Sequence, residues 1–198
     1  MQSVISAQSG LTHRTRTLHE SVPGRIVLVF AATAVVAACA HVSLPLPFTP
    51  VPLTLQNFGV LLVGMALGPV TAFSAMVLYL AQGAMGLPMF TPHGPMGVAR
   101  LLGPTAGFLF SYPLAAASAG WVVHAMRNVS SRFTRGIVAG IVATLIIFVC
   151  GAGWMASLMH LSASATWHMA VAPFLPGEAI KVTAAAGIFS AMRRWRQA

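Results

Sequence analysis

The sequence predicts an all-α integral membrane protein with six transmembrane helices and both ends of the chain in the cytoplasm. Hydrophobic residues make up 57% of the 198 residues and charged residues only 7%, whereas an ordinary soluble domain has about 25% charged residues. The mean hydropathy is +0.82. A stretch of 74 residues, 26–99, contains no Asp, Glu, Lys or Arg. A soluble domain is therefore excluded, and the membrane is the expected environment of the chain.

The expected helices follow from the apolar segments and from the prolines and glycines that separate them. At about 20 residues per crossing, the uncharged stretch accommodates three helices. Four prolines within residues 44–52 predict an ordered, non-helical loop, and Gly68-Pro69 predicts a tight turn. Residues 86–104 hold four prolines and four glycines and form the longest expected loop. The six expected spans are 26–42, 53–68, 69–85, 103–126, 135–160 and 169–192, the last interrupted early by prolines.

The arginines predict the orientation of these spans. They cluster before the first span, between the fourth and fifth spans, and after the sixth span. Six crossings place all three clusters on one side, which is the cytoplasmic side by the positive-inside rule. The nine residues are Arg14, Arg16, Arg25, Arg127, Arg132, Arg135, Arg193, Arg194 and Arg196. The chain is thus divided into a cytoplasmic tail (1–25), a six-helix substrate-binding membrane domain (26–192) and a basic cytoplasmic end (193–198). Arginines in these positions orient the chain and do not form a nucleic-acid-binding surface.

Metal and disulfide chemistry are not expected. Cys39 and Cys150 are isolated in apolar segments, too few for a disulfide framework or a zinc site. Residues 36–39 resemble a lipoprotein cleavage site, an alternative that would remove the first expected helix. His160 and His168 have no carboxylate or cysteine at metal-ligand spacing. We expect no metal and no cofactor, and the absence of a phosphate-binding loop makes ATP hydrolysis by this chain unexpected.

Three charged residues remain once the orienting arginines and Glu20 are set aside: Arg100, Glu178 and Lys181. Charges within a membrane domain usually face a cavity or a partner. Glu178 and Lys181 are three residues apart and share a helical face, so they could simply neutralise each other. If Arg100 folds over the same cavity, the three charges sum to +1, which suits a ligand with one carboxylate. Lys181 or Arg100 would then bind this carboxylate, and Glu178 would accept hydrogen bonds from N–H groups of the ligand.

Uncharged polar residues lie at the same outer level as these charges. Gln56, Asn57, Tyr79, Gln82 and Thr105 stand near the outer ends of the second, third and fourth spans. Each of them could be a helix cap or an interfacial anchor. Their common level predicts that several of them line one pocket.

The proline-rich loop 44–52 is also expected on the outer side. Phe48 and Thr49 lie at its centre, where they could close over a bound ligand. We therefore count both residues among the expected ligand contacts.

Small residues on the first and fifth spans predict close helix contacts. Ala34 and Ala38 lie on one face of the first span, and Gly136 and Gly140 on one face of the fifth. These faces could pack inside the molecule or could dock another membrane protein.

Five motifs, in order along the chain, resemble the BioY family, the substrate-capturing S components of energy-coupling-factor (ECF) biotin transporters. The motifs are VPLTLQN at 51–57, LGP at 67–69, Tyr79 followed by GAMGLPMF at 83–90, GPTAGF at 103–108 and PFLPGEAIK at 173–181. The resemblance implies a six-helix S-component fold in the bacterial cytoplasmic membrane and high-affinity biotin capture at the outer face. It also implies partner subunits, a transmembrane coupling subunit docked on Ala34 and Ala38 and separate ATPase subunits. The family usually has Asp at the position of Glu178, and Gln82 is a further candidate contact for the ureido ring of biotin.

Other functions stay open at this stage. A proton-coupled secondary carrier for a small carboxylated vitamin could use Glu178 as its proton site. The chain could also act as a homo-oligomer without coupling subunits. An enzyme is not expected, because no convincing nucleophile, base or metal cluster is present.

Overall fold

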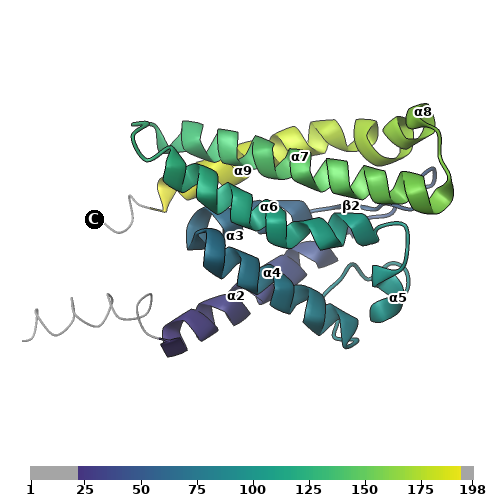
Figure 1. Ribbon diagram of the computed structural model, residues 1–198, viewed down its shortest axis with the longest axis horizontal. Helices are drawn as coiled ribbons and strands as arrows, with labels where there is room; N and C mark the ends of the chain where they lie inside the picture. Colours follow the sequence, from purple (N-terminus) through teal and green to yellow (C-terminus); the bar gives the residue numbers. More distant parts are fainter. Residues whose placement is uncertain (1–21, 193–198) are drawn as a thin grey trace, which may run out of the picture.

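The computed structural model describes residues 22–192, which form a mostly helical protein (Figure 1). Its helices are α2 (Val22–His41), α3 (Gln56–Leu67), α4 (Pro69–Ala84), α5 (Val98–Leu101), α6 (Ala106–Ala125), α7 (Arg132–Met159), α8 (Ala163–Thr166), η1 (Trp167–Val171), η2 (Ala172–Phe174) and α9 (Leu175–Ala191). Two short strands, β1 (Ser43–Leu44) and β2 (Leu53–Thr54), pair antiparallel. The predicted roles of Arg14, Arg16, Glu20, Arg193, Arg194 and Arg196 fall outside the described residues.

The helices of the first half are close to the expected spans. α2 begins at Val22, four residues before the expected start, so Arg25 lies in its first turn. The turn between α3 and α4 forms because Gly68 adopts a positive φ of 79° and Pro69 opens α4, a position where its missing N–H is harmless. α3 has 12 residues and α4 has 16, so both are short.

The two proline-rich connections have more structure than a plain loop. Residues 44–52 are non-helical as expected, and the strand pair β1–β2 closes them into a hairpin, with Ser43 opposite Thr54. Residues 86–104 contain the four-residue helix α5, which the sequence analysis missed. Gly97 precedes α5 with a φ of 65°, a conformation that glycine adopts without strain.

The sixth span is interrupted early, as expected, but the break lies before Leu175 and not at Pro176. The chain passes through α8, a π-helical segment η1 and a 3-10 segment η2 before the regular helix α9 begins at Leu175. Pro173 lacks the N–H that a continuous helix needs, so the hydrogen-bond pattern changes around it. Pro176 lies in the first turn of α9, where it starts the helix and does not break it. Glu178 consequently lies in the first turn of α9.

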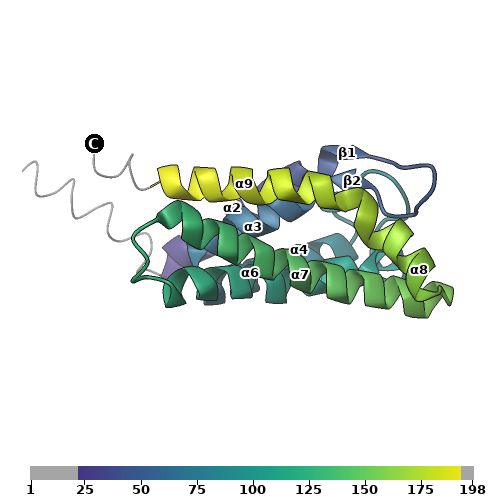
Figure 2. The ribbon, with the colours of Figure 1, turned by 90° about the horizontal axis from the view of Figure 1, so that it is seen from above.

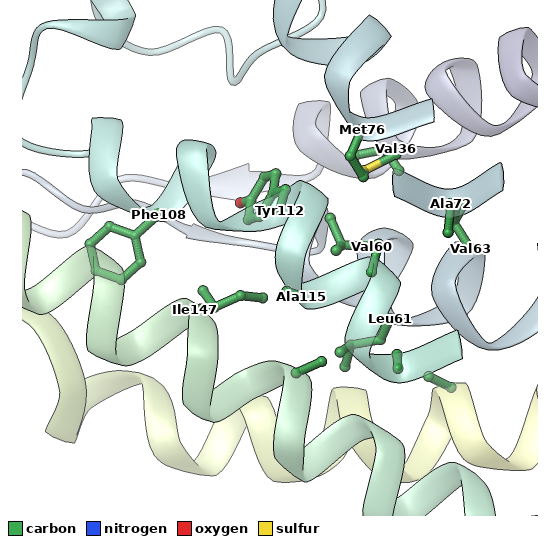
Figure 3. Packing of buried hydrophobic residues seen from close by; sticks show 14 of the residues in the cluster. Val36, Val60, Leu61, Val63, Ala72, Met76, Phe108, Tyr112, Ala115 and Ile147 are labelled. Carbon is green, nitrogen blue, oxygen red and sulfur yellow. The ribbon is translucent and has the colours of Figure 1, made fainter. Parts of the chain in front are cut away.

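The long helices form one bundle with a shared core. α6 packs on α3, α4 and α7, whereas α9 packs on α3 and α7, and α2 covers α3 and α4. Figure 3 shows side chains of this core, among them Val36 of α2, Val60 of α3, Met76 of α4, Tyr112 of α6 and Ile147 of α7. Glycines allow the closest approaches. A Cβ on Gly64 of α3 would lie 2.5 Å from the Ala116 carbonyl oxygen of α6.

A single methyl group is expected to disturb the packing at Gly120. A Cβ added there would lie 2.6 Å from the Pro69 nitrogen and 2.7 Å from the Gly68 carbonyl carbon, and backbone atoms of a turn cannot swing aside. We expect Gly120→Ala to lower the free energy of unfolding by about 1–3 kcal/mol, the usual range for an overpacked interior. Gly153→Ala is the matched control, because nothing lies within 4 Å of its Cβ position, and it should be neutral or stabilising. Thermal unfolding in detergent measures both variants, and equal melting temperatures would contradict the packing argument.

The bundle has two distinct ends. The start of α2, the connection between α6 and α7, and the end of α9 lie together at one end in both ribbon views (Figures 1 and 2). The β1–β2 hairpin, α5 and α8 lie at the opposite end. Within residues 22–192, three helices, α2, α6 and α7, are long and apolar enough to cross a membrane by themselves.

Candidate functional site

A cavity lies at the end of the bundle that holds the hairpin and α5. Its wall combines the charged and polar side chains singled out in the sequence with aromatic and aliphatic ones. The lining residues are Val51, Pro52, Thr54, Gln56, Asn57, Phe90, Thr91, Arg100, Thr105, Phe108, Leu109, Tyr112, Phe148, Phe174, Glu178 and Lys181. The cavity therefore draws together the beginnings of α3, α6 and α9 and the helix α5.

Glu178 is the electrostatic centre of this cavity. Its carboxylate is 3% exposed, and its Oε1 accepts a hydrogen bond from Lys181 Nζ at 2.6 Å. The same Oε1 accepts a second bond from Asn57 Nδ2 at 3.1 Å. The position of Glu178 in the first turn of α9 adds the favourable field of a helix N-terminus. These contacts provide two hydrogen-bond donors for one carboxylate oxygen.

The second carboxylate oxygen, Glu178 Oε2, is buried and has no hydrogen-bond partner among the described residues. A buried acceptor without a donor costs free energy, so such atoms in folded proteins usually have a function. Here the oxygen belongs to a residue of the cavity wall. It can accept a hydrogen bond from a ligand that carries an N–H or O–H group.

Arg100 is the second cation of the cavity wall and is 7% exposed. Its guanidinium donates hydrogen bonds to the His93 carbonyl oxygen and to Thr91 Oγ1. Burial lowers its pKa, but an arginine starts from about 12 or above and stays charged at neutral pH. Within residues 22–192 the only carboxylate side chain is that of Glu178, which pairs with Lys181. Arg100 therefore has no ion-pair partner in this part of the chain.

A second buried hydrogen-bond chain lies beside the cavity. Gln56 Nε2 donates to the Tyr79 hydroxyl at 2.7 Å, and this hydroxyl donates to the Met89 carbonyl oxygen at 2.5 Å. Gln56 reaches the cavity wall, whereas Tyr79 is fully buried behind it. Gln82 does not line this cavity, and its buried Oε1 has no partner among the described residues. These two hydrogen bonds thus connect α3 and α4 to the loop that carries Arg100.

The two loop residues expected as a cover lie in different environments. Phe48 is 56% exposed and does not line the cavity. Thr49 is buried, and its hydroxyl donates to the Met169 carbonyl oxygen of η1 at 2.7 Å. Thr49 also lines an outer hollow that shares Arg100 and Thr105 with the inner cavity. Loop 44–52 therefore rests on the segment before α9 in this structure.

The sequence analysis missed the aromatic part of the wall. Phe108 and Tyr112 come from α6, Phe148 from α7, and Phe90 and Phe174 from the segments that precede α5 and α9. Phe108, Tyr112 and Phe148 stand in helices that are apolar on all sides, so no periodic pattern marks their inward faces. Phe90 and Phe174 lie outside the regular α-helices, where helical periodicity does not apply. Tyr112 has one local signal, a hydroxyl in the middle of an apolar helix.

The two faces rich in small residues differ in the structure. Ala34 and Ala38 are exposed on α2, while their neighbours Val36 and Ala40 are buried. Internal packing of Ala34 and Ala38, one of the two interpretations of the sequence, is therefore wrong. The face of α7 does pack internally, since a Cβ on Gly136 would lie 2.8 Å from Ala186 of α9.

Metal binding has no support in the described residues. No group of three His, Cys, Asp or Glu side chains is placed to hold a metal ion in residues 22–192. The cysteines of this region are free thiols.

Comparison with known proteins yields one consistent result. A family model described as the BioY family matches residues 11–198. The probable biotin transporter BioY of Bacillus subtilis (strain 168) is 38% identical over 143 residues, which cover 71% of this chain and 74% of that protein. The biotin transporter BioY of Rhodobacter capsulatus is 33% identical over 166 residues, covering 79% of this chain and 86% of the relative.

A solved structure has the same fold. The crystal structure of the S-component for biotin from an ECF-type ABC transporter matches with a TM-score of 0.78 and 24% sequence identity. The match covers 86% of this chain and 90% of that chain. At this identity the likeness shows the fold.

Proposed function

Because this chain belongs to the BioY family, we propose that it is the biotin-capturing S component of an ECF-type transporter. In this role it binds biotin from outside the cell and is a transport protein, not an enzyme. Relatives named as biotin transporters and the shared S-component fold support the proposal.

The observation that carries the proposal is the charge pattern of the cavity. Two buried cations, Arg100 and Lys181, and one buried anion, Glu178, give a net charge of +1. Biotin has one carboxylate to match the excess positive charge. Its ureido ring has two N–H donors, which suit the unpartnered Glu178 Oε2. Its sulfur ring and aliphatic chain suit the aromatic wall.

The carboxylate of biotin is assigned to Arg100, with Lys181 beside it. Lys181 already bonds Glu178 at 2.6 Å, whereas Arg100 has no anionic partner within residues 22–192. A guanidinium also offers two parallel donors to a carboxylate. The ureido ring then lies toward Glu178 at the start of α9.

Six membrane spans, α2, α3, α4, α6, α7 and α9, complete the proposed architecture. With both chain ends in the bacterial cytoplasm, the biotin cavity opens to the outside. The common position of the α2 start, the α6–α7 connection and the α9 end supports this orientation (Figure 1). Arg25 lies in the first turn of α2, and Arg127, Arg132 and Arg135 lie in or beside the α6–α7 connection, as the positive-inside rule favours.

Coupling subunits are the proposed partners. The exposed alanines of α2 form a smooth, membrane-facing surface that another helix can approach closely. Separate ATPase subunits supply the energy, since this sequence has no phosphate-binding loop.

Bulky substitutions on this surface should separate binding from transport. Ala34→Leu and Ala38→Leu should block close helix approach, so ATP-dependent biotin uptake in cells should fall at least about 10-fold. Biotin binding by the purified chain should be unchanged, because both side chains point away from the cavity. Ala81→Leu, at an exposed position of α4, is the matched control and should leave uptake and binding unchanged. Loss of binding in the α2 variants would contradict the docking role.

The function itself is tested by a binding titration of the detergent-purified protein. Biotin and desthiobiotin, which share the ureido ring and the carboxylate, should both bind. Lipoate, which has the carboxylate but no ureido N–H, should bind far more weakly. Absence of biotin binding by the folded protein would contradict the proposal. Collapse of cellular uptake by a protonophore at constant ATP would instead support a proton-coupled carrier.

A further inference from the structure

The hydrogen bonds around Glu178 form a directed chain across three helices. The Tyr112 hydroxyl of α6 donates to Asn57 Oδ1 of α3 at 3.0 Å. Asn57 Nδ2 then donates to Glu178 Oε1 of α9 at 3.1 Å. All three residues line the cavity, and Tyr112 and Glu178 are buried. We refer to these three residues as the Tyr112–Asn57–Glu178 relay.

The relay has only one arrangement that satisfies its groups. An ionised carboxylate accepts hydrogen bonds and cannot donate, so Asn57 must present its NH₂ group to Glu178. The Asn57 carbonyl oxygen then faces Tyr112, which must donate its O–H. An Asn57 amide turned by 180° would place its oxygen against the carboxylate, an unfavourable contact in a buried site. The carboxylate therefore sets the orientation of the Asn57 amide, and the hydrogen bond from the Tyr112 hydroxyl holds the amide in that orientation.

The relay also gives the two carboxylate oxygens of Glu178 different roles. Oε1 is occupied by Asn57 and by Lys181, whose Nζ is 2.6 Å away. Oε2 is buried and has no donor among the described residues. A carboxylate free to rotate about its last bond could offer either oxygen to a ligand, whereas two donors on Oε1 hold the group in one orientation.

We propose that Asn57 and Tyr112 are specificity-determining positioning residues, which orient Glu178 so that Oε2 selects ligands by one N–H donor. The proposal rests on biotin as the ligand and adds the residues that set its recognition. Neither residue needs to touch the ureido group. They act by holding the acceptor in place, which lowers the cost of ordering it when the ligand binds.

The test compares Tyr112→Phe with the wild-type protein on three ligands: biotin and the two biotins methylated at one ureido nitrogen. In the wild type, at least one methylated biotin should bind about 10-fold or more weakly, because it lacks the donor for Oε2. In Tyr112→Phe, biotin should weaken about 5- to 10-fold. The binding of the weaker methylated analogue should decrease much less. The discrimination ratio, which is the affinity for biotin divided by the affinity for this analogue, should therefore fall.

Two further variants separate positioning from folding. Asn57→Ala removes the same relay from its middle and should reduce the ratio in the same way, even if Tyr112→Phe folds poorly. Ser111→Ala removes a neighbouring buried hydroxyl of α6 that bonds only the Phe108 carbonyl oxygen in the described structure, and it should leave the ratio unchanged. Thermal unfolding in detergent accompanies each titration.

The outcomes distinguish the two levels of the proposal. A wild-type protein that fails to bind biotin overturns the proposed function. A wild type that binds biotin and both methylated analogues equally overturns the role of Oε2. Equal weakening of biotin and its analogues in both relay variants makes the relay a packing feature and overturns the specificity role.

Discussion

Lys181→Ala should weaken biotin binding by about 2–5 kcal/mol, the range for removing one member of a buried charge pair. The variant leaves the Glu178 carboxylate without its cation at 2.6 Å and reduces the charge of the cavity from +1 to zero. The carboxylate of biotin then enters a cavity that has no excess positive charge. Isothermal titration calorimetry measures this loss of binding free energy.

The uncharged amide of biotin is the informative comparison. The amide carries no negative charge for Lys181 to attract. Lys181→Ala should therefore weaken the binding of the amide less than that of biotin. Lys181→Arg keeps the charge and should retain most of the affinity. Equal losses for the acid and the amide would contradict the view that Lys181 helps to bind an anion.

Arg100→Gln should also cost biotin about 2–5 kcal/mol of binding free energy, because it removes the cation of the cavity wall that is not paired with Glu178. Glutamine keeps an NH₂ group that can donate to the His93 carbonyl oxygen or to Thr91, so part of the loop contact survives. The preference for biotin over its amide should nearly disappear.

The two variants together show which cation meets the carboxylate. The acid-over-amide preference should fall further in Arg100→Gln than in Lys181→Ala. Arg100→Lys keeps the charge but not the planar fork of donors, so it should lie between the wild type and Arg100→Gln. A preference that survives Arg100→Gln unchanged would contradict this assignment.

The charged part of the site could be predicted because charges are costly in a membrane domain. Arg100, Glu178 and Lys181 are the charges that remain once the orienting arginines and Glu20 are set aside, and the structure places all three on one cavity wall. The family resemblance, taken from motifs around the same residues, is confirmed by the family match. A charged residue in a membrane domain has few possible locations besides a cavity or a partner. The spacing of these residues and the orientation of the spans were therefore sufficient to predict that they share a site.

The aromatic wall and the relay could not be predicted in the same way. α6 is apolar around its whole circumference, so composition does not tell which of its faces holds Phe108 or Tyr112. The hydrogen bond from Tyr112 to Asn57 joins residues 55 positions apart, and only the tertiary packing brings them together. Likewise, Pro173 predicts an interruption of the helix but does not predict the π-helical turn that precedes it.

The unequal helix lengths have a consequence for the surrounding lipid. At 1.5 Å per residue, the 28 residues of α7 extend about 42 Å and the 16 residues of α4 about 24 Å. The hydrocarbon layer is about 30 Å thick, so in the proposed topology α7 must tilt or project while the bilayer thins beside α4. In that topology the two helices match different bilayer thicknesses. We therefore expect acyl-chain length to change the tilt of the whole protein, and with it the inclination of the binding cavity to the membrane surface.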